Sequence, residues 1–243
     1  MERTKYIVII LLLGSFSALH ASHASDIYAA YIGGNMAKWK KTIDEMHQKK
    51  DKNNAFVMEL LNYEYGFIGW CMGNDKHSLA KEYLRRAEAN IEILENRKYM
   101  PSILNAYKSA FYGFKIGMNK IQAPFLGPKS LSHAKQAIEL DPKNPFGYVQ
   151  YGNAMYYMPE AFGGSKTTAL KNYKKAQSLY EVERETNKHD WNYLSLLITI
   201  ANACKEMKRK TEAKAYYELL LKIEPGFLWV KNELYPQLLN EIK

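Results

Sequence analysis

The residue types that most often carry chemistry are few and widely spaced in this chain of 243 residues. The histidines beyond residue 24 are His47, His77, His133 and His189, and no two of them stand four residues apart. A zinc site needs several ligands that converge within about 2.0–2.3 Å of the metal. The spacing supports no such site, so we expect surface histidines and no bound metal.

The motifs of nucleophilic and phosphate chemistry are also missing. The sequence contains neither a G-x-S-x-G nucleophile elbow nor a G-x-x-x-x-G-K-[ST] phosphate loop. Residues 163–166, Gly-Gly-Ser-Lys, resemble a phosphate cradle at a helix N-terminus. No strand precedes them, however, and a tight turn with a positive φ angle before a serine cap explains them better. We therefore predict a non-enzymatic protein without a cofactor.

The elements that would position any site are predicted to be helices throughout. Apolar residues recur at helical spacing in most segments beyond Ser25, as in the stripe of Ile103, Tyr107, Ala110 and Phe114. We find no convincing run with the strict alternation of a half-buried strand. The fold class predicted from the sequence is therefore all-α.

Several of these helices repeat a pattern of small and large residues. Residues 134–142 and 213–225 each place such residues along a helix that a proline terminates. The helices expected to come first in each pair carry a small residue on the side that should face the second helix. These small residues are Gly66, Gly113, Gly152 and Ala201. A small residue lets a second helix approach closely, so the pattern predicts helical hairpins.

The pattern resembles the tetratricopeptide repeat (TPR), a unit of about 34 residues with two helices and a final proline. The last unit matches best, because Ala201 and Ala213 are 12 residues apart, as the repeat requires. In the two preceding units the corresponding spacing is 17 residues, which predicts elongated turns at residues 123–128 and 160–165. The Phe-Gly-Gly turn also loosely resembles the periplasmic T component of tripartite ATP-independent transporters.

The expected architecture is a TPR-like α-solenoid of about four helix pairs in a single domain, residues 25–243. We expect an extra N-terminal helix at residues 36–47 and a capping segment at residues 228–242, kinked or interrupted at Pro236. Cys71 and Cys204 fall three repeats apart, whereas a disulfide needs Cα atoms within about 7 Å. We therefore expect two buried free thiols.

A repeat array of this kind binds partners on its concave face, which the first helices of the pairs line. The groove positions carry aromatic side chains and two amides, which can hold a peptide backbone because an amide both donates and accepts. The candidate binding residues are Tyr63, Phe67, Trp70, Phe146, Asn153, Tyr156, Tyr157, Phe162, Ile198, Asn202 and Lys205. For Tyr156 and Tyr157, packing between helices is an equal alternative.

Residues 1–24 have the order of a secretory signal peptide. Arg3 and Lys5 precede an apolar run at residues 6–13, and small residues follow. We place the cleavage after Ala24, with Ala21 as the next choice. An uncleaved anchor is the alternative, but the run is shorter than the roughly 20 residues of a spanning helix. We expect an exported, soluble protein, most compatible with a periplasm.

The chain has 34 basic against 25 acidic residues, but the basic ones are spread over different predicted helices. Nucleic-acid-binding proteins concentrate such charge on one face, so we expect no nucleic-acid partner and only an indirect relation to a membrane. Our first hypothesis is an exported scaffold that binds a protein or peptide in its groove, in an envelope or transport assembly. The alternative is a periplasmic carrier of a small hydrophobic ligand, with Phe125 and Phe162 roofing an apolar pocket.

Overall fold

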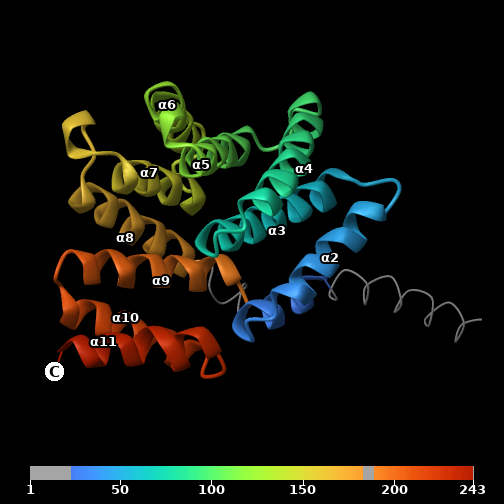
Figure 1. The fold of residues 1–243 in the computed structure, drawn as a ribbon. Coiled ribbons are helices and arrows are strands. Elements are labelled where there is room, and N and C mark those ends of the chain that lie inside the picture. The colour runs from blue at the N-terminus through green and yellow to red at the C-terminus, as the bar shows by residue number, and fades with distance from the viewer. Residues whose placement is uncertain (1–22, 183–188, 243) are drawn as a thin grey trace, which may run out of the picture.

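The computed structural model describes residues 23–182 and 189–242, and all regular structure in these ranges is helical (Figure 1). After a first helix at residues 23–32, the elements are α2 (Met36–Gln48), α3 (Asn54–Gly73), α4 (His77–Asn96), α5 (Pro101–Met118), η1 (Lys120–Gln122), α6 (Ala123–Leu140), α7 (Pro145–Tyr157), η2 (Glu160–Phe162), α8 (Lys166–Val182), α9 (Trp191–Glu206), α10 (Lys210–Ile223), η3 (Val230–Leu234) and α11 (Tyr235–Ile242). The all-α prediction is confirmed. The predicted signal peptide lies almost wholly outside the described residues.

Consecutive helices pack as hairpins. The most extensive contacts join α3 to α4, α5 to α6, α7 to α8 and α9 to α10, which are the four predicted pairs. The connections within these pairs have three or four residues, except for the longer one between α7 and α8 that contains η2, and each second helix turns back along the first. The first helix and α2 precede these pairs, where the sequence led us to expect only one extra helix.

Two of the predicted small residues permit close approach, but with different partners. A Cβ atom on Gly152 would lie 2.4 Å from the ring of Tyr173 on α8, so this glycine admits the second helix of its own pair. A Cβ atom on Gly66 would lie 2.6 Å from Trp191 and 2.7 Å from Trp39. Gly66 therefore makes room for indole rings from α9 and α2, and not for α4 as the repeat pattern suggested.

Gly113 does not take the role that the pattern assigned to it. Its backbone faces open space, with no other atom within 4 Å of a Cβ placed there. The close contact of this pair lies one turn earlier, where the Ser130 hydroxyl donates to the Ser109 carbonyl over 2.8 Å. The close contact that the repeat pattern placed at Gly113 thus lies one helical turn earlier on α5.

The first predicted elongated turn is also corrected, because residues 123–128 are the opening turns of α6. Pro124 stands in the first turn of the helix, where the missing N–H costs nothing. Pro128 has no backbone N–H, so α6 lacks one hydrogen bond to a carbonyl one turn earlier. The short turn η1 alone joins α5 to α6, whereas residues 160–165 form a turn as predicted.

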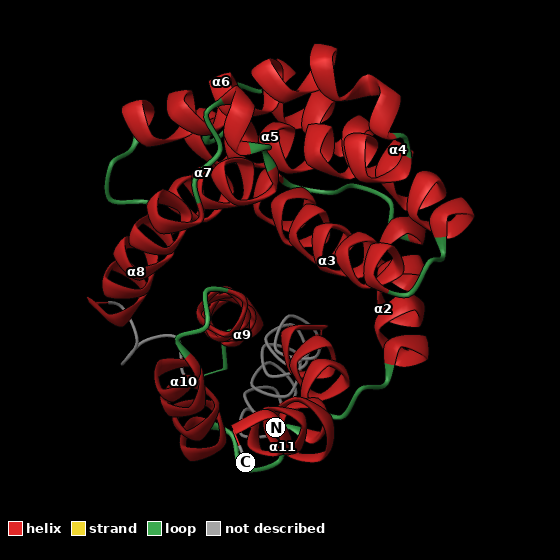
Figure 2. Cartoon of the chain, turned by 60° about the vertical axis from the view of Figure 1, so that its left-hand side comes forward, coloured by secondary structure: helices red, strands yellow, loops and turns green. Residues whose placement is uncertain are grey.

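The two ends of the helical array meet and close it. Figure 2 shows the hairpins curving round until the helix at residues 23–32 lies beside α9 and α11. The Tyr28 hydroxyl donates to the Glu224 carboxylate over 2.9 Å, although 196 residues separate them. Tyr31 lies with its ring 5.8 Å from that of Trp191 and 5.1 Å from that of Phe227. The first helices of the pairs therefore surround a centre that is filled by aromatic side chains of the protein itself.

The C-terminal segment is helical from residue 228 to residue 242, as the expected cap required. A π-helical turn, η3, precedes Pro236, and the Tyr235 amide donates to the Val230 carbonyl five residues back. The wider turn accommodates a residue that cannot donate to the helix. The predicted interruption at Pro236 thus takes the form of a π turn. The described thiols of Cys71 and Cys204 are buried and free, as predicted.

Asp44 links α2 to α4 and sets a pH-dependent part of the stability. Its carboxylate accepts hydrogen bonds from Lys40 (2.6 Å), Tyr83 (2.6 Å) and Arg86 (2.8 Å). Burial alone would raise the pKa of Asp44, but these three donors outweigh it and lower the pKa from 3.8 to about 2. A carboxyl whose pKa is lowered by folding stabilises the fold above its unfolded pKa and loses that contribution as the pH falls.

We predict that Asp44→Asn lowers the free energy of unfolding by about 1 kcal/mol at pH 7, allowing for solvent screening of this half-buried group. The difference from the parent should shrink between about pH 4 and pH 2. Urea unfolding at several pH values measures it. Asp51→Asn is the control, because Asp51 is exposed and makes no hydrogen bond or ion pair with the described residues. An equal loss at pH 2 and pH 7 would contradict the prediction.

Candidate functional site

Three of the predicted groove residues do not face a groove. Tyr63, Phe67 and Ile198 are all buried in the hydrophobic core. Phe67 packs against the ring of Tyr83 at 4.7 Å between ring centres. These residues hold neighbouring helices together and offer no surface to a ligand.

The two amides predicted to hold a peptide are engaged within their own repeats. Asn153 accepts from the Tyr173 hydroxyl over 2.9 Å and donates to the Gln150 side chain over 3.0 Å. Asn202 accepts from the Tyr217 hydroxyl over 2.7 Å. In both repeats an amide on the first helix thus meets a tyrosine on the second. The oxygen of each amide is thus engaged by a tyrosine, and the NH2 group of Asn153 is engaged by Gln150 as well.

The remaining inward-facing aromatic residues form a packed cluster. The Tyr65 ring lies 5.7 Å from Tyr107, 5.3 Å from Phe146 and 6.4 Å from Trp191. The Gln150 amide donates to the Tyr65 hydroxyl over 3.1 Å. Helices α3, α5, α7 and α9 are joined through this cluster. Phe146 is therefore half-buried and serves packing between repeats.

Trp70 and Lys205 lie at separate places near the ends of their helices. The half-buried Trp70 stacks on Phe67 at 5.6 Å, and the Lys76 ammonium lies 5.6 Å from the Trp70 ring centre. Lys205 forms an ion pair with Glu241 over 2.8 Å and so ties α9 to the capping helix. The structure does not bring these two residues into one site.

Four large apolar side chains are exposed where α5 meets α6 and where α7 meets α8. The exposed fractions are 83% for Ile121, 74% for Phe125, 79% for Tyr157 and 77% for Phe162. We call these four residues the apolar edge. Tyr157 and Phe162 belong to the predicted site, and Phe125 to the alternative hypothesis. Ile121 was missed, although an isoleucine between Lys120 and Gln122 in a polar connection was a signal.

The two halves of the apolar edge lie at the same border of the helical array. Helices α5 and α7 run in the same direction, because α6 turns back between them. The Tyr107 and Phe146 rings are 4.7 Å apart and align the two helices. Met118 and Tyr157 follow eleven residues later on each helix and are the last residues of α5 and α7. The connection that carries Ile121 and the connection that carries Phe162 therefore begin at the same end of these two parallel helices.

The local sequence holds Phe162 out into solvent. Gly163 has a φ angle of 92°, and the Gly163 amide donates to the Glu160 carbonyl over 2.9 Å. Gly164 lies so close to the chain that a Cβ would meet the Met158 carbonyl oxygen at 1.8 Å. The Ser165 hydroxyl accepts from the Thr168 amide over 3.1 Å, which caps α8. The predicted tight turn with a serine cap is confirmed.

The charged side chains beside the connection between α7 and α8 are largely neutralised. Lys166 pairs with Glu206 over 2.8 Å, and its ammonium lies 5.4 Å from the centre of the Tyr156 ring. The Lys166 ammonium and then the Tyr156 hydroxyl lower the pKa of Glu206. Burial and then the Glu206 carboxylate raise the pKa of Tyr156, so that its phenol is neutral at physiological pH. The Lys166–Glu206 pair therefore leaves no net charge beside Tyr156, and Glu160 is the exposed acidic residue of this half of the edge.

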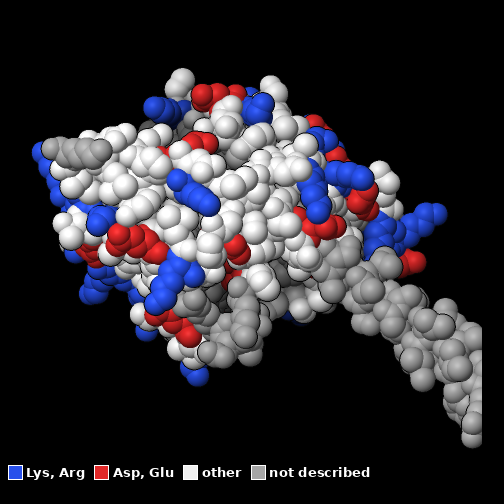
Figure 3. Space-filling view, turned by 90° about the horizontal axis from the view of Figure 1, so that it is seen from below, with Lys and Arg blue, Asp and Glu red and all other residues white. Residues whose placement is uncertain are grey.

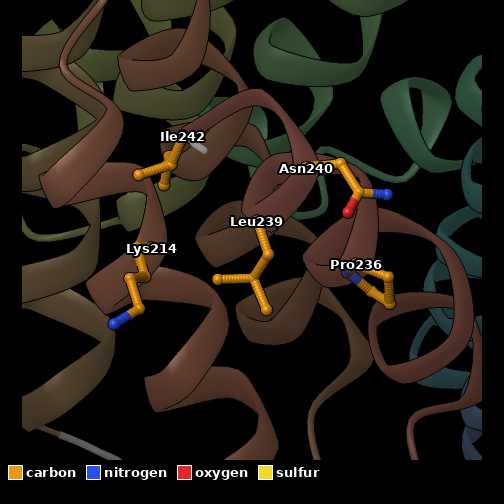
Figure 4. Close-up of a pocket in the computed structure, with 5 residues that line it drawn as sticks. All are labelled: Lys214, Pro236, Leu239, Asn240 and Ile242. Atoms are coloured by element: carbon orange, nitrogen blue, oxygen red, sulfur yellow. The ribbon is translucent and has the colours of Figure 1, made fainter.

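A separate hollow lies at the C-terminal end of the array (Figure 4). It has a volume of about 390 Å³, lies between α10 and α11, and is open to solvent. Its lining is Lys214, Pro236, Leu239, Asn240 and Ile242. Its single charged lining residue, Lys214, forms an ion pair with Glu218 over 3.3 Å, and no second titratable side chain lines the hollow.

The described residues hold no cluster of three or more His, Cys, Asp or Glu side chains that could bind a metal ion. On the face shown in Figure 3, basic and acidic side chains are interspersed. None of the described helices has the length and hydrophobicity to cross a bilayer. The feature of the described surface that most clearly indicates binding is therefore the apolar edge, since exposed apolar patches mark interaction sites.

The helical hairpins, their order and their close contacts define a TPR-like helical repeat protein. Residues 194–227, in α9 and α10, form a tetratricopeptide repeat by their match to that family. The fold is similar to that of the HusA haemophore from Porphyromonas gingivalis, with a TM-score of 0.62 and 18% sequence identity. The similarity covers 77% of this chain and 93% of the haemophore chain. No curated protein sequence matches the chain.

Proposed function

We propose that this protein is an exported, non-enzymatic carrier of a flat apolar ligand of the haem class, which it binds at the apolar edge. The observation that carries the proposal is the exposure of Ile121, Phe125, Tyr157 and Phe162 on two neighbouring connections. Exposing four such side chains to water is unfavourable, and covering them with an apolar ring system removes that cost. Aromatic side chains also stack well on a flat ring.

A small ligand at this edge fits the contacts better than a peptide in the concave groove. The amides that would hold a peptide, Asn153 and Asn202, are bound to tyrosines of their own repeats. The centre of the array is filled by the aromatic cluster around Tyr65 and Trp191. The fold similarity to a protein named a haemophore supports this ligand class. The predicted signal peptide supports the exported location.

Titration of residues 25–243 with haemin, followed by its visible absorption, tests the proposal. We predict saturable binding that the double variant Phe125→Ser, Phe162→Ser weakens at least about tenfold, because burying an aromatic side chain contributes about 1.5–3 kcal/mol. The control is Ile93→Ser with Leu228→Ser, which removes two partly exposed apolar residues outside the edge. Equal affinity of both double variants and the parent, or no haemin binding at all, would refute the proposal.

A second candidate is a scaffold for a protein partner in an envelope or transport assembly. The repeat at residues 194–227 favours it, because TPR arrays serve as interaction surfaces. Cross-linking of the parent protein in a periplasmic extract, repeated with the Phe125→Ser, Phe162→Ser variant, tests it. A partner captured by both proteins would place the scaffold surface away from the apolar edge, and capture of no partner would count against this candidate.

A further inference from the structure

The lysines around the apolar edge fall into two classes. Lys115 and Lys166 form ion pairs with glutamates of neighbouring helices. Lys120 and Lys129 are exposed and form no ion pair with any described residue. Two ammonium groups beside the apolar surface therefore lack a protein counter-charge.

Both unpaired lysines belong to the half of the edge formed by α5 and α6. Lys120 immediately precedes Ile121 in η1. Lys129 stands four residues after Phe125 on α6, and residues with this spacing are neighbours on one helix face. The other half of the edge carries the opposite charge, because Glu160 in η2 is exposed and unpaired among the described residues.

We infer that the ligand of the apolar edge carries acidic groups on one side, and that Lys120 and Lys129 bind these groups and set the ligand's orientation. The inference rests on the proposed function and adds the orientation of the ligand, because rings of the haem class bear carboxylates on one side. The acidic side of the ring faces the connection between α5 and α6. Its apolar side faces Tyr157 and Phe162, where Glu160 would repel a carboxylate.

The size of the effect follows from the exposure of these groups. Ion pairs at a protein surface contribute about 0.2–1 kcal/mol each. Removal of both lysine charges should therefore weaken binding of an acidic ligand about threefold to tenfold. The same change should leave binding of an uncharged ligand of equal shape unaffected, because the apolar contacts remain.

Protoporphyrin IX and its dimethyl ester provide the two probes, since they share the ring and differ in the carboxylate charges. Fluorescence titrations under one buffer and cosolvent compare the parent, the variant Lys120→Gln, Lys129→Gln, and Glu160→Gln. The control is Lys135→Gln, an exposed α6 position six residues beyond Lys129, or about 9 Å along the helix.

We expect the free acid to bind the parent more tightly than the ester, the double lysine variant to lose that preference, and Lys135→Gln to keep it. Glu160→Gln should leave or slightly raise the affinity for the acid. Equal affinity of the parent for acid and ester would overturn the inference while the proposed function stands, as would an equal loss for both probes in the lysine variant. If neither porphyrin binds, the proposed function itself fails.

Discussion

Replacing Gly152 with alanine is expected to lower the free energy of unfolding by about 2–3 kcal/mol. A Cβ at this position would lie 2.4 and 2.7 Å from two atoms of the Tyr173 ring, which is buried and hydrogen-bonded to Asn153. The ring cannot move without disturbing that bond and the packing of α7 on α8. The overlap therefore outweighs the gain in helix propensity that alanine brings.

Gly113→Ala is the matched control, because it makes the same change at a helical glycine that faces open space. We expect it to raise the free energy of unfolding by about 0.5–1 kcal/mol, the ordinary preference for alanine over glycine in a helix. Urea unfolding of the two variants measures both effects. A gain in stability for Gly152→Ala like that expected for Gly113→Ala would show that α7 and α8 do not approach as closely as the structure has them.

Phe227→Ala should have the largest effect, a loss of about 3–5 kcal/mol in the free energy of unfolding. Phe227 is fully buried in the link after α10 and packs on Tyr31 of the first helix at 5.1 Å. The cavity left by the ring would separate the N-terminal helix from the last repeat. Amide hydrogen exchange should therefore rise first at residues 25–32, before global unfolding.

Tyr28→Phe serves as the milder comparison, because it removes only the hydrogen bond to Glu224. We expect a loss of about 1 kcal/mol from this variant. If Phe227→Ala left exchange at the first helix unchanged, closure of the array by this contact would be disproved. If Tyr28→Phe lowered the free energy of unfolding as much as Phe227→Ala, the hydrogen bond to Glu224 would instead be the contact that holds the two ends of the array together.

Comparison of two glycines shows why register was harder to predict than helix content. Gly152 and Gly113 stand in similar apolar stripes, yet only Gly152 meets the second helix of its pair. Helical periodicity repeats every turn, so a stripe cannot tell which turn makes the contact. In the pair of α5 and α6 that contact falls on Ser109 and Ser130, one turn before the expected place.

In the candidate site, too, some features could be predicted from the sequence and others could not. The turn after Phe162 followed from local signals, because Gly-Gly-Ser is typical of a tight turn before a serine cap, whereas the exposure of Phe162 itself was found only in the structure. The burial of Tyr63, Phe67 and Ile198 did not follow, since it depends on the helices packed against them. Tyr63 contacts Trp39 of α2, and Phe67 contacts Tyr83 of α4.

The sequence by itself determined the all-α class, the four hairpins and the final repeat at residues 194–227, because periodicity and short spacings are written within each segment. The tertiary structure decided that the ends meet through Tyr28 and Glu224, 196 residues apart. It also decided that Asn153 and Asn202 bind tyrosines of their own repeats. The meeting of the ends depends on small rotations that accumulate from one hairpin to the next, and no single segment encodes their sum. The amide–tyrosine bonds depend on how each helix is turned toward its partner, which the apolar pattern of one helix does not specify.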